Sequence, residues 1–436
     1  MSTAAVRPLK TAAENALAEQ FTSAKGRLNG NLAAREEAFG VVADGLPSRR
    51  VEEWKYTDLR ALMRDALPLA ELPTVGEINS VREQMAEHAV DSARIVFVNG
   101  SLIEGVSDLG SLPAGVEAVS IARAYAENHP LIARSGEAPI PPDNAAVALN
   151  TAFVSDGVVL RVAAGTKVER PLHLVFVQQG NGHAAYTRVV VVVEAGAQVE
   201  IIETHSGEGS HQTNTVVELV ADDNADVTMV KLQAESLGTQ HLATFGAKLG
   251  AEVKLKTVNI ARGAAMARQQ MFLTFAGDST NAELHGISLS GGRRHLDTTM
   301  FVDHAAYGCE SRETFKSVLD GESRSVFQGK ILVRQNAQKT DGRMMMRALM
   351  LSEGSEADMK PELEIYADDV QCAHGATCAA LDDEHLFYLR ARGIPKMEAE
   401  AILVEAFVGE VLEAVDNEPL REKLAIITNE WLRTRD

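Results

Sequence analysis

The order of apolar and polar residues divides the chain into three zones. Residues 1 to about 90 are rich in Ala, Glu, Leu and Arg and poor in β-branched residues, a composition typical of helices. In the segment 95–104, two short apolar runs flank Asn99-Gly100, a dipeptide favoured in tight hairpin turns. We therefore predict that residues 1–140 form a mainly helical region with a short β-hairpin, which ends in the Pro-rich connector at 139–142.

The middle zone, residues 141–360, consists of short apolar or alternating runs that are separated by turn residues. Runs of this length that are rich in Val, Ile and Thr are typical of β-strands. We expect strands throughout this zone, because no helical period of convincing length interrupts it. The six clearest runs are 158–162, 173–177, 188–193, 199–204, 215–220 and 227–232.

A weak internal repeat runs through the middle zone. Similar short segments place alanine at 197, 225, 251 and 282 and Cys309 in the next slot, at nearly constant intervals. A second set of strands begins near 187, 214, 241, 268 and 295. Two strands per repeat at a nearly constant period predict a parallel β-helix with about 27 residues per coil, whereas a β-sandwich predicts no such period. Its ends need covers, either the helical flanks or another chain.

The last zone, residues 361–436, begins with a predicted final strand at 361–366 and continues as three helices. The first helix is expected from about Asp382 to Arg392, and the last has a single apolar stripe with spacings of 4, 3 and 4. The middle helix, about 396–416, has two apolar stripes, so it either packs inside a three-helix group or contacts a partner. The stripes are Val404, Val408, Val411 and Val415, and Ile402, Leu403, Ala406 and Phe407.

Charge and composition exclude several classes of function. The chain has 61 acidic and 42 basic residues, a formal net charge of −19 that disfavours binding to nucleic acid or to an anionic membrane. The longest aliphatic run, 189–193, is far too short to span a bilayer. The first residues contain no apolar segment of the kind found in signal peptides, so we expect a cytoplasmic protein with reduced thiols.

The sharpest local candidate for chemistry is the pair Cys372 and His374. In an extended segment, residues two apart project to the same side, so a thiol and an imidazole would lie together. Both are good metal ligands, but a closed site commonly needs four, so the others would come from elsewhere in the chain or from another subunit. The alternative is structural, with a small buried cysteine beside a turn histidine. Cys309 is expected in the core, and Cys378 fits no known metal-binding spacing.

The motifs of nucleotide-driven enzymes are absent from the sequence. The only Gly-Lys pair, Gly329-Lys330, is followed by isoleucine and forms no P-loop, and the 207–212 segment lacks the third glycine of a dinucleotide fingerprint. Neither a G-x-S-x-G nucleophile elbow nor an HExxH motif occurs. We therefore do not expect a self-sufficient nucleotide-driven enzyme.

Several motifs resemble one known family. The run PELEIYADDVQCAHGAT at 361–377 and its continuation LFYLRARGI at 386–394 are similar to the hallmark of the SufB/SufD family, scaffold proteins of the Suf iron–sulfur cluster assembly system. QKTD at 338–341 and LNTAF at 149–153 also match. The segment RRVEEWKYTDL at 49–59 resembles the SufD branch rather than the SufB branch.

The resemblance implies a mainly β fold, a right-handed parallel β-helix flanked by N-terminal and C-terminal helical regions. It implies a scaffold subunit rather than an enzyme, which pairs with a SufB-like paralogue through the β-helix end and leaves ATP hydrolysis to a SufC-like ATPase. A transient iron–sulfur cluster would form at the SufB-like interface, with His374 contributing and Cys372 as its neighbour. The residues expected to dock the ATPase are Leu386, Phe387, Leu389, Ile402, Leu403 and Phe407.

The family resemblance further allows flavin in the complex and a homodimer of the isolated chain, with no cofactor bound by this chain alone. The sequence departs from the family pattern at 342–348, where GRMMMRA replaces a Gln-containing segment, and at Ala379-Ala380. Two other functions stay open. One is a purely structural or interaction solenoid, and the other is a carbohydrate-active β-helix enzyme, which the low aromatic content of 5% disfavours.

Overall fold

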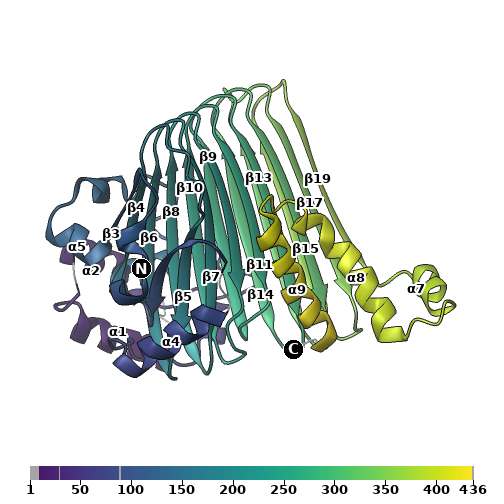
Figure 1. The fold of residues 1–436 in the computed structure, drawn as a ribbon, viewed down its shortest axis with the longest axis horizontal. Coiled ribbons are helices and arrows are strands. Elements are labelled where there is room, and N and C mark those ends of the chain that lie inside the picture. Colours follow the sequence, from purple (N-terminus) through teal and green to yellow (C-terminus); the bar gives the residue numbers. More distant parts are fainter. Residues whose placement is uncertain (1–8, 29, 88–89, 435–436) are drawn as a thin grey trace, which may run out of the picture.

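The computed structural model describes residues 9–28, 30–87 and 90–434 and shows a mainly β molecule built around a two-sheet solenoid (Figure 1). Its strands are β1 Ala93–Val98, β2 Ser101–Leu102, β3 Val116–Ser120, β4 Asp156–Val162, β5 Leu172–Gln178, β6 His183–Val193, β7 Gln198–Gly207, β8 His211–Ala221, β9 Asp226–Gln233, β10 Gln240–Leu249, β11 Lys254–Ala261, β12 Met266–Phe275, β13 Asn281–Ser290, β14 His295–His304, β15 Glu310–Leu319, β16 Arg324–Val333, β17 Asp341–Met350, β18 Glu356–Ile365 and β19 Gln371–Ala379.

Helices precede and follow this solenoid and also interrupt its first strands. The α-helices are α1 Ala12–Ala24, α2 Leu32–Ala43, α3 Leu59–Leu62, α4 Val75–Glu87, α5 Ile121–Ala126, α6 Ala145–Phe153, α7 Asp383–Arg390, α8 Lys396–Leu412 and α9 Glu418–Thr434. Short 3-10 turns are η1 Glu52–Trp54, η2 Glu104–Val106, η3 Leu109–Ser111 and η4 Pro130–Arg134. Among the described residues, no helix combines the length and the apolar character that a bilayer crossing requires.

From β4 onward successive strands alternate between the two sheets, which confirms a parallel β-helix with two strands per coil. The ten-stranded sheet has the order β19-β17-β15-β13-β11-β9-β7-β5-β1-β2, and the nine-stranded sheet has the order β18-β16-β14-β12-β10-β8-β6-β4-β3. From β4 onward every neighbouring pair of strands within a sheet is parallel. Gln240 pairs with Met266 and Arg324 pairs with Glu356, so the coils near the free end are longer than those in the middle of the stack.

The alanine slots that marked the repeat are only partly in register. One ladder of backbone hydrogen bonds runs along the coils, in which the carbonyl oxygen of one residue accepts a bond from an N–H group of the next coil. The accepting residues, which occupy equivalent positions, are Ala197, Ala225, Val253, Thr280 and Cys309. Ala251 and Ala282 therefore lie two positions away from the slots that the repeat gave them, because the turns between strands differ in length. Cys309 does belong to the ladder and is fully buried, so its predicted place in the core is confirmed.

The solenoid has an apolar interior, and helices cover the outer faces of both sheets. Helices α1, α2 and α6 pack on the nine-stranded sheet through a cluster that includes Phe21, Phe153 and Tyr186. Helices α8 and α9 cross the ten-stranded sheet, where Val404, Val408, Val411 and Val415 pack among residues of β7 to β17 (Figure 1). The first apolar stripe of α8 is thus internal.

Three local features differ from the sequence expectation or refine it. The helix α6 occupies the start of the middle zone, where only strands were expected; it is apolar on almost all sides and almost completely buried. The predicted hairpin is confirmed, with Asn99 and Gly100 at φ 50° and 81°, and its first strand joins the ten-stranded sheet beside β5. The strand expected at 361–366 is the second half of β18, and β19 follows it as the last strand.

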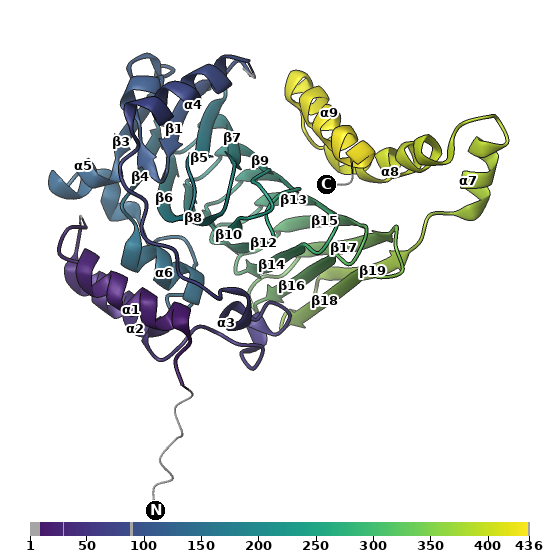
Figure 2. The same ribbon diagram turned by 90° about the horizontal axis from the view of Figure 1, so that it is seen from below.

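The three expected C-terminal helices are present as α7, α8 and α9. Figure 2 shows that α7 lies beyond the end of the sheets, while α8 and α9 lie over the ten-stranded sheet. The boundaries at residues 140 and 360 between the expected regions stay a prediction.

The N-terminal segment 49–59 is anchored on the outer face of the nine-stranded sheet. The Trp54 ring lies against the guanidinium group of Arg268 in β12, and the carbonyl oxygen of Glu53 accepts a hydrogen bond from the same group at 2.6 Å. Thr57 Oγ1 lies 2.8 Å from His295 Nε2 in β14, and Glu52 forms an ion pair with Lys360 of β18 at 2.5 Å. This segment therefore holds the N-terminal region across the last coils of the solenoid.

Candidate functional site at the free end of the solenoid

The last coil of the solenoid, formed by β18 and β19, has no further coil on its outer side. Strand β19 pairs only with β17, and β18 only with β16, so in the described part of the chain one edge of each strand carries no strand neighbour. Figures 1 and 2 show this open end beside α7. Unpaired edge strands present free backbone donors and acceptors to another chain, so this end is suited to pairing with a second solenoid.

Strand β19 places Cys372 and His374 on one side, as predicted. Cys372 pairs with Gly342 of β17, which in turn pairs with Ser311 of β15. In the same way, His374 pairs with Met344, and Met344 pairs with Glu313. Cys372 packs against the interior cluster of which Met344 is a buried member, so both side chains belong to the interior face of the coil. Cys372 is half-buried and His374 is exposed, because the stack stops at this strand.

Cys378 occupies the same alternate phase of β19 as Cys372 and His374. The rise per residue in a strand is ~3.3 Å, so Cys372 and Cys378, six positions apart, stand ~20 Å from each other. They cannot ligate the same mononuclear ion. Cys378 is exposed and Cys309 lies buried inside the solenoid, so the three free cysteines occupy three different environments.

Burial keeps the Cys372 thiol protonated. Burial raises the pKa of Cys372 above its ordinary value, and the nearby acidic groups of Asp341 and Glu313 act in the same direction when they are ionised, although a backbone hydrogen bond at Gly342 opposes them. A thiol must lose its proton to act as a nucleophile or a metal ligand. At neutral pH the Cys372 thiol is therefore expected to lose its proton only when a metal ion or a cationic group of a partner lies beside it.

A buried carboxyl group lies two coils below His374 and was missed by the sequence analysis. Glu313 is 1% exposed; the Ser311 hydroxyl lies beside its carboxyl group, but no hydrogen bond of good geometry reaches either carboxyl oxygen among the described residues. Burial raises the pKa of Glu313 to about 8, so its carboxyl group is neutral at pH 7. The available signal was the alternation of β15, in which Glu313 falls in phase with the inward-facing Ser311 and Phe315.

The glycine at 342, part of the departure from the family pattern, leaves space beneath the thiol. A Cβ atom at Gly342 would lie no closer than 3.4 Å to any neighbour, and that neighbour is Ser311 Oγ. Gly342 stands between Cys372 and Ser311 in the register and contributes no side chain there, and Ile331 borders the same position at 3.7 Å.

The predicted docking residues of the C-terminal helices differ in exposure. Phe387 in α7 is 74% exposed and Ile402 in α8 is 40% exposed, and Tyr388 and Met397 are also exposed apolar side chains of these two helices. The other four predicted residues, Leu386, Leu389, Leu403 and Phe407, are half-buried. The second stripe of α8 therefore stays partly open, while its first stripe is used in the fold.

Comparison with known proteins supplies a family. The model described as "SUF system FeS cluster assembly, SufBD core domain" matches residues 176–407, and the model of the SufBD protein N-terminal region matches residues 23–174. An iron–sulfur cluster assembly SufBD family protein of Synechocystis is 30% identical over 393 residues, which cover 87% of this chain and 86% of the relative.

Two further relatives match most of the chain. The iron–sulfur cluster assembly protein SufD of Escherichia coli is 29% identical over 397 residues, 90% of either chain. The protein ABCI7, chloroplastic, of Arabidopsis thaliana is 28% identical over 394 residues, which cover 86% of this chain and 81% of the relative. With both family models matching and the β-solenoid in place, the chain belongs to the SufBD family of SUF-system iron–sulfur cluster assembly proteins and is a SufD-type member of it.

Proposed function

We propose that this chain is the non-ATPase, SufD-like subunit of a SufB–SufC–SufD scaffold complex that assembles iron–sulfur clusters and transfers them to apo-proteins. The observation that carries the proposal is the exposed imidazole of His374 beside the Cys372 thiol on the terminal strand β19, whose outer edge is open. Thiolate and imidazole groups bind iron–sulfur clusters, and two such groups from one chain make half of a site. A SufB-like paralogue would supply the rest.

The shape of the open end supports a partner that is itself a β-solenoid. Added strands from a second solenoid would satisfy the free backbone groups of β18 and β19 and enclose the cluster between two chains. In the absence of that paralogue, the same edge would pair two copies of this chain. The expected compartment is the cytoplasm, where thiols stay reduced. The cluster would be transient, and any flavin would be held by the assembled complex.

Docking of a SufC-like ATPase is proposed for α7 and the open stripe of α8. The exposed aromatic and aliphatic side chains of Phe387, Tyr388 and Ile402 offer the anchors that commonly carry binding energy in protein interfaces. ATP hydrolysis would belong to that partner, since the present sequence has no P-loop.

The deciding experiment compares His374→Ala with Thr377→Ala in an anaerobically reconstituted complex. Thr377 is also exposed on β19 but faces the opposite side of the strand, so its substitution controls for damage to the strand edge. We expect His374→Ala to lower the iron and sulfide content of the complex and cluster transfer to an apo-protein, with Thr377→Ala unchanged. Equal cluster content in both variants and the parent would leave only the role of a structural interaction solenoid.

A further inference from the structure

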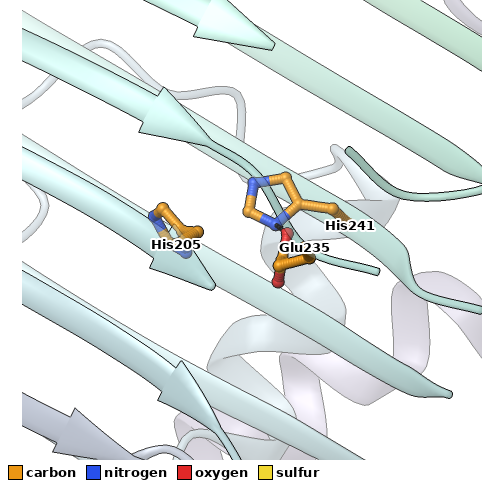
Figure 3. Close-up of side chains that lie close together, drawn as sticks. All are labelled: His205, Glu235 and His241. Atoms are coloured by element: carbon orange, nitrogen blue, oxygen red, sulfur yellow. Dashed lines mark ion pairs between the residues drawn. The ribbon is translucent and has the colours of Figure 1, made fainter. Parts of the chain in front are cut away.

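A cluster of metal-ligating side chains lies inside the solenoid, far from the free end in the coil order. His205 comes from β7, Glu235 from the turn that follows β9, and His241 from β10 (Figure 3). One potential ligand atom from each residue lies within 4.8 Å of the other two, and all three residues are at most 3% exposed. Two imidazoles and one carboxylate form a donor set that zinc and ferrous iron bind in proteins.

Neighbouring polar groups hold the three side chains in place. His205 Nε2 lies 2.6 Å from Glu203 Oε1, and because a carboxylate only accepts, Nε2 carries the proton and Nδ1 keeps its lone pair. Glu235 accepts hydrogen bonds from Gln233 Nε2 at 2.9 Å and from Thr213 Oγ1 at 3.0 Å. A histidine that donates to a carboxylate through one nitrogen and binds through the other is the usual arrangement around a bound metal ion.

The protonation states also suit a cation. Burial lowers the pKa of His205 to about 4, and the nearby Lys231 ammonium group acts in the same direction, so the imidazole is neutral at pH 7. Burial by itself would raise the pKa of Glu235, but the neighbouring imidazoles and its hydrogen bonds outweigh burial and leave the pKa below its ordinary value. A neutral imidazole and an ionised carboxylate are forms that bind metal ions.

A lysine and a second carboxylate border the cluster. Lys231 Nζ lies 3.5 Å from His241 Nε2 and 3.1 Å from Glu203 Oε1. The ion would therefore lie close to two buried carboxylates, Glu203 and Glu235, which attract a divalent cation.

Binding of a cation between His241 and Glu235 requires only local changes. The His241 Nδ1 atom, now 2.8 Å from Glu235 Oε2 and 2.9 Å from Thr213 Oγ1, would bind the ion in place of these contacts, and the Lys231 ammonium would move away from Nε2, which would then carry the ring proton. Lys231 would lose its contact with that nitrogen but keep its contacts with Glu203 and, at 2.9 Å, with Gln269 Oε1. A cavity of about 30 Å³ beside His241, lined also by Lys231 and Gln233, has room for one water molecule, but neither His205 nor Glu235 lines it.

We propose that His205, Glu235 and His241 form a second metal site, which binds one divalent transition-metal ion, zinc or ferrous iron, inside the solenoid. The site is independent of Cys372 and His374 and of any partner chain. Without a metal ion, the same residues would form an ordinary buried hydrogen-bond network around a Glu235–His241 pair. The experiment therefore has to separate these two states.

The test uses the full chain with Cys372→Ser, His374→Gln and Cys378→Ser, so that the donors of β19 cannot contribute to the result. This background protein is purified from zinc-supplemented and from iron-supplemented anaerobic cultures, analysed for metal, stripped with a chelator and titrated with Zn²⁺, Fe²⁺ and the spectroscopic probe Co²⁺. We expect one equivalent of bound metal, with Co²⁺ absorption that lacks any thiolate charge-transfer band. His205→Gln, Glu235→Gln and His241→Gln should each weaken binding by at least roughly tenfold, and Glu203→Gln by roughly 10–100-fold.

His304→Gln is the matched control, because His304 is also fully buried in the interior but bonds only Ser311 Oγ, at 3.0 Å, among the described residues. Its metal content should equal that of the background protein. If the folded background protein retains no metal and gives no Co²⁺ absorption, the proposal is overturned whatever the variants do. Equal binding by the background and by a folded His241→Gln protein would overturn it as well. Neither result bears on cluster assembly at β19, which the His374→Ala comparison tests separately.

Discussion

The guanidinium carbon of Arg268 lies 4.1 Å from the centre of the Trp54 ring, and neither side chain reaches the solvent to any extent. Arg268 also forms an ion pair with Asp297 and donates to the carbonyl oxygen of Glu53. The indole ring thus covers a buried charge that is also paired with Asp297 and bonded to the backbone, while the Arg268 Nε atom has no hydrogen-bond partner among the described residues. This contact ties a segment near the N-terminus to strands from the second half of the sequence.

Removal of the Trp54 ring should therefore detach the N-terminal segment. We expect Trp54→Ala to lower the free energy of unfolding by ~3–5 kcal/mol, the usual cost of removing a buried aromatic side chain, and to expose residues 49–59 to proteases. Trp54→Phe, which keeps a ring over Arg268, should lose less. Denaturant unfolding and limited proteolysis measure both effects. A Trp54→Ala protein as stable and as protease-resistant as the parent would contradict this role.

Glu313 should make the stability of the protein depend on pH. Its pKa rises from 4.5 to about 8 on folding, so the folded state binds more protons than the unfolded state between these values, and stability falls as pH rises from about 4.5 to 8. Glu313→Gln removes this dependence. Relative to the parent, the free energy of unfolding of the variant should increase as pH rises through that window, by at most roughly 4–5 kcal/mol. At pH 4 the substitution should bring no such increase. Parallel unfolding curves at pH 4, 6 and 8 test the sign; a constant difference would contradict it.

The three cysteines should react with an alkylating reagent in a fixed order. Cys378 is exposed, Cys372 is half-buried with a raised thiol pKa, and Cys309 is buried with a raised thiol pKa. Since the thiolate is the reactive form, iodoacetamide at neutral pH should modify Cys378 first, Cys372 more slowly and Cys309 only after unfolding. Mass spectrometry of quenched time points gives the three rates. Modification of Cys372 as fast as that of Cys378 would show that its environment is not as described.

The exposed apolar side chains of α7 and α8 should carry ATPase binding. Phe387→Ser and Ile402→Ser should each weaken binding of a SufC-like ATPase by roughly tenfold or more, since a lost apolar anchor commonly costs over about 1 kcal/mol. Leu237→Ser is the matched control, because Leu237 is 54% exposed on the turn between β9 and β10, away from these helices. Calorimetric titration measures the affinities. Equal losses for all three variants would assign the effect to something other than the helices.

The solenoid could be predicted because its signal is local and repeated. Each coil contributes alternating inward residues, such as Val199 and Ile201, and a turn after each strand, so two strands per repeat were visible before any register was known. The same period of two placed Cys372 and His374 on one side of β19 correctly. The sequence analysis expected the last strand at 361–366, so it did not predict that residues 371–379 form a further, terminal strand on which His374 is exposed.

Register between coils could not be predicted, and the interior clusters depend on it. Because the coils differ in length, the turns are shifted from one coil to the next. Ala251 and Ala282 therefore do not occupy the positions equivalent to Ala197 and Cys309. His205, Glu235 and His241 come from separate elements of the sequence and meet only because of the stacking of β7, β9 and β10. Helix α6 was missed for another reason: it has only nine residues, and only Asn150 and Thr151 among them are polar, so the segment is too short to show a clear helical period.

The two ends of the solenoid differ, and this difference limits the assemblies that the chain can form. At the N-terminal end, the two-residue strand β2 and the antiparallel strand β3 terminate the sheets, whereas β18 and β19 present ten-residue and nine-residue edges at the other end. A solenoid that has open strand edges only at its β18–β19 end can pair with one other solenoid through that end, and the pair has no further open end. End-to-end union of solenoids through this face therefore yields closed pairs and never a growing filament.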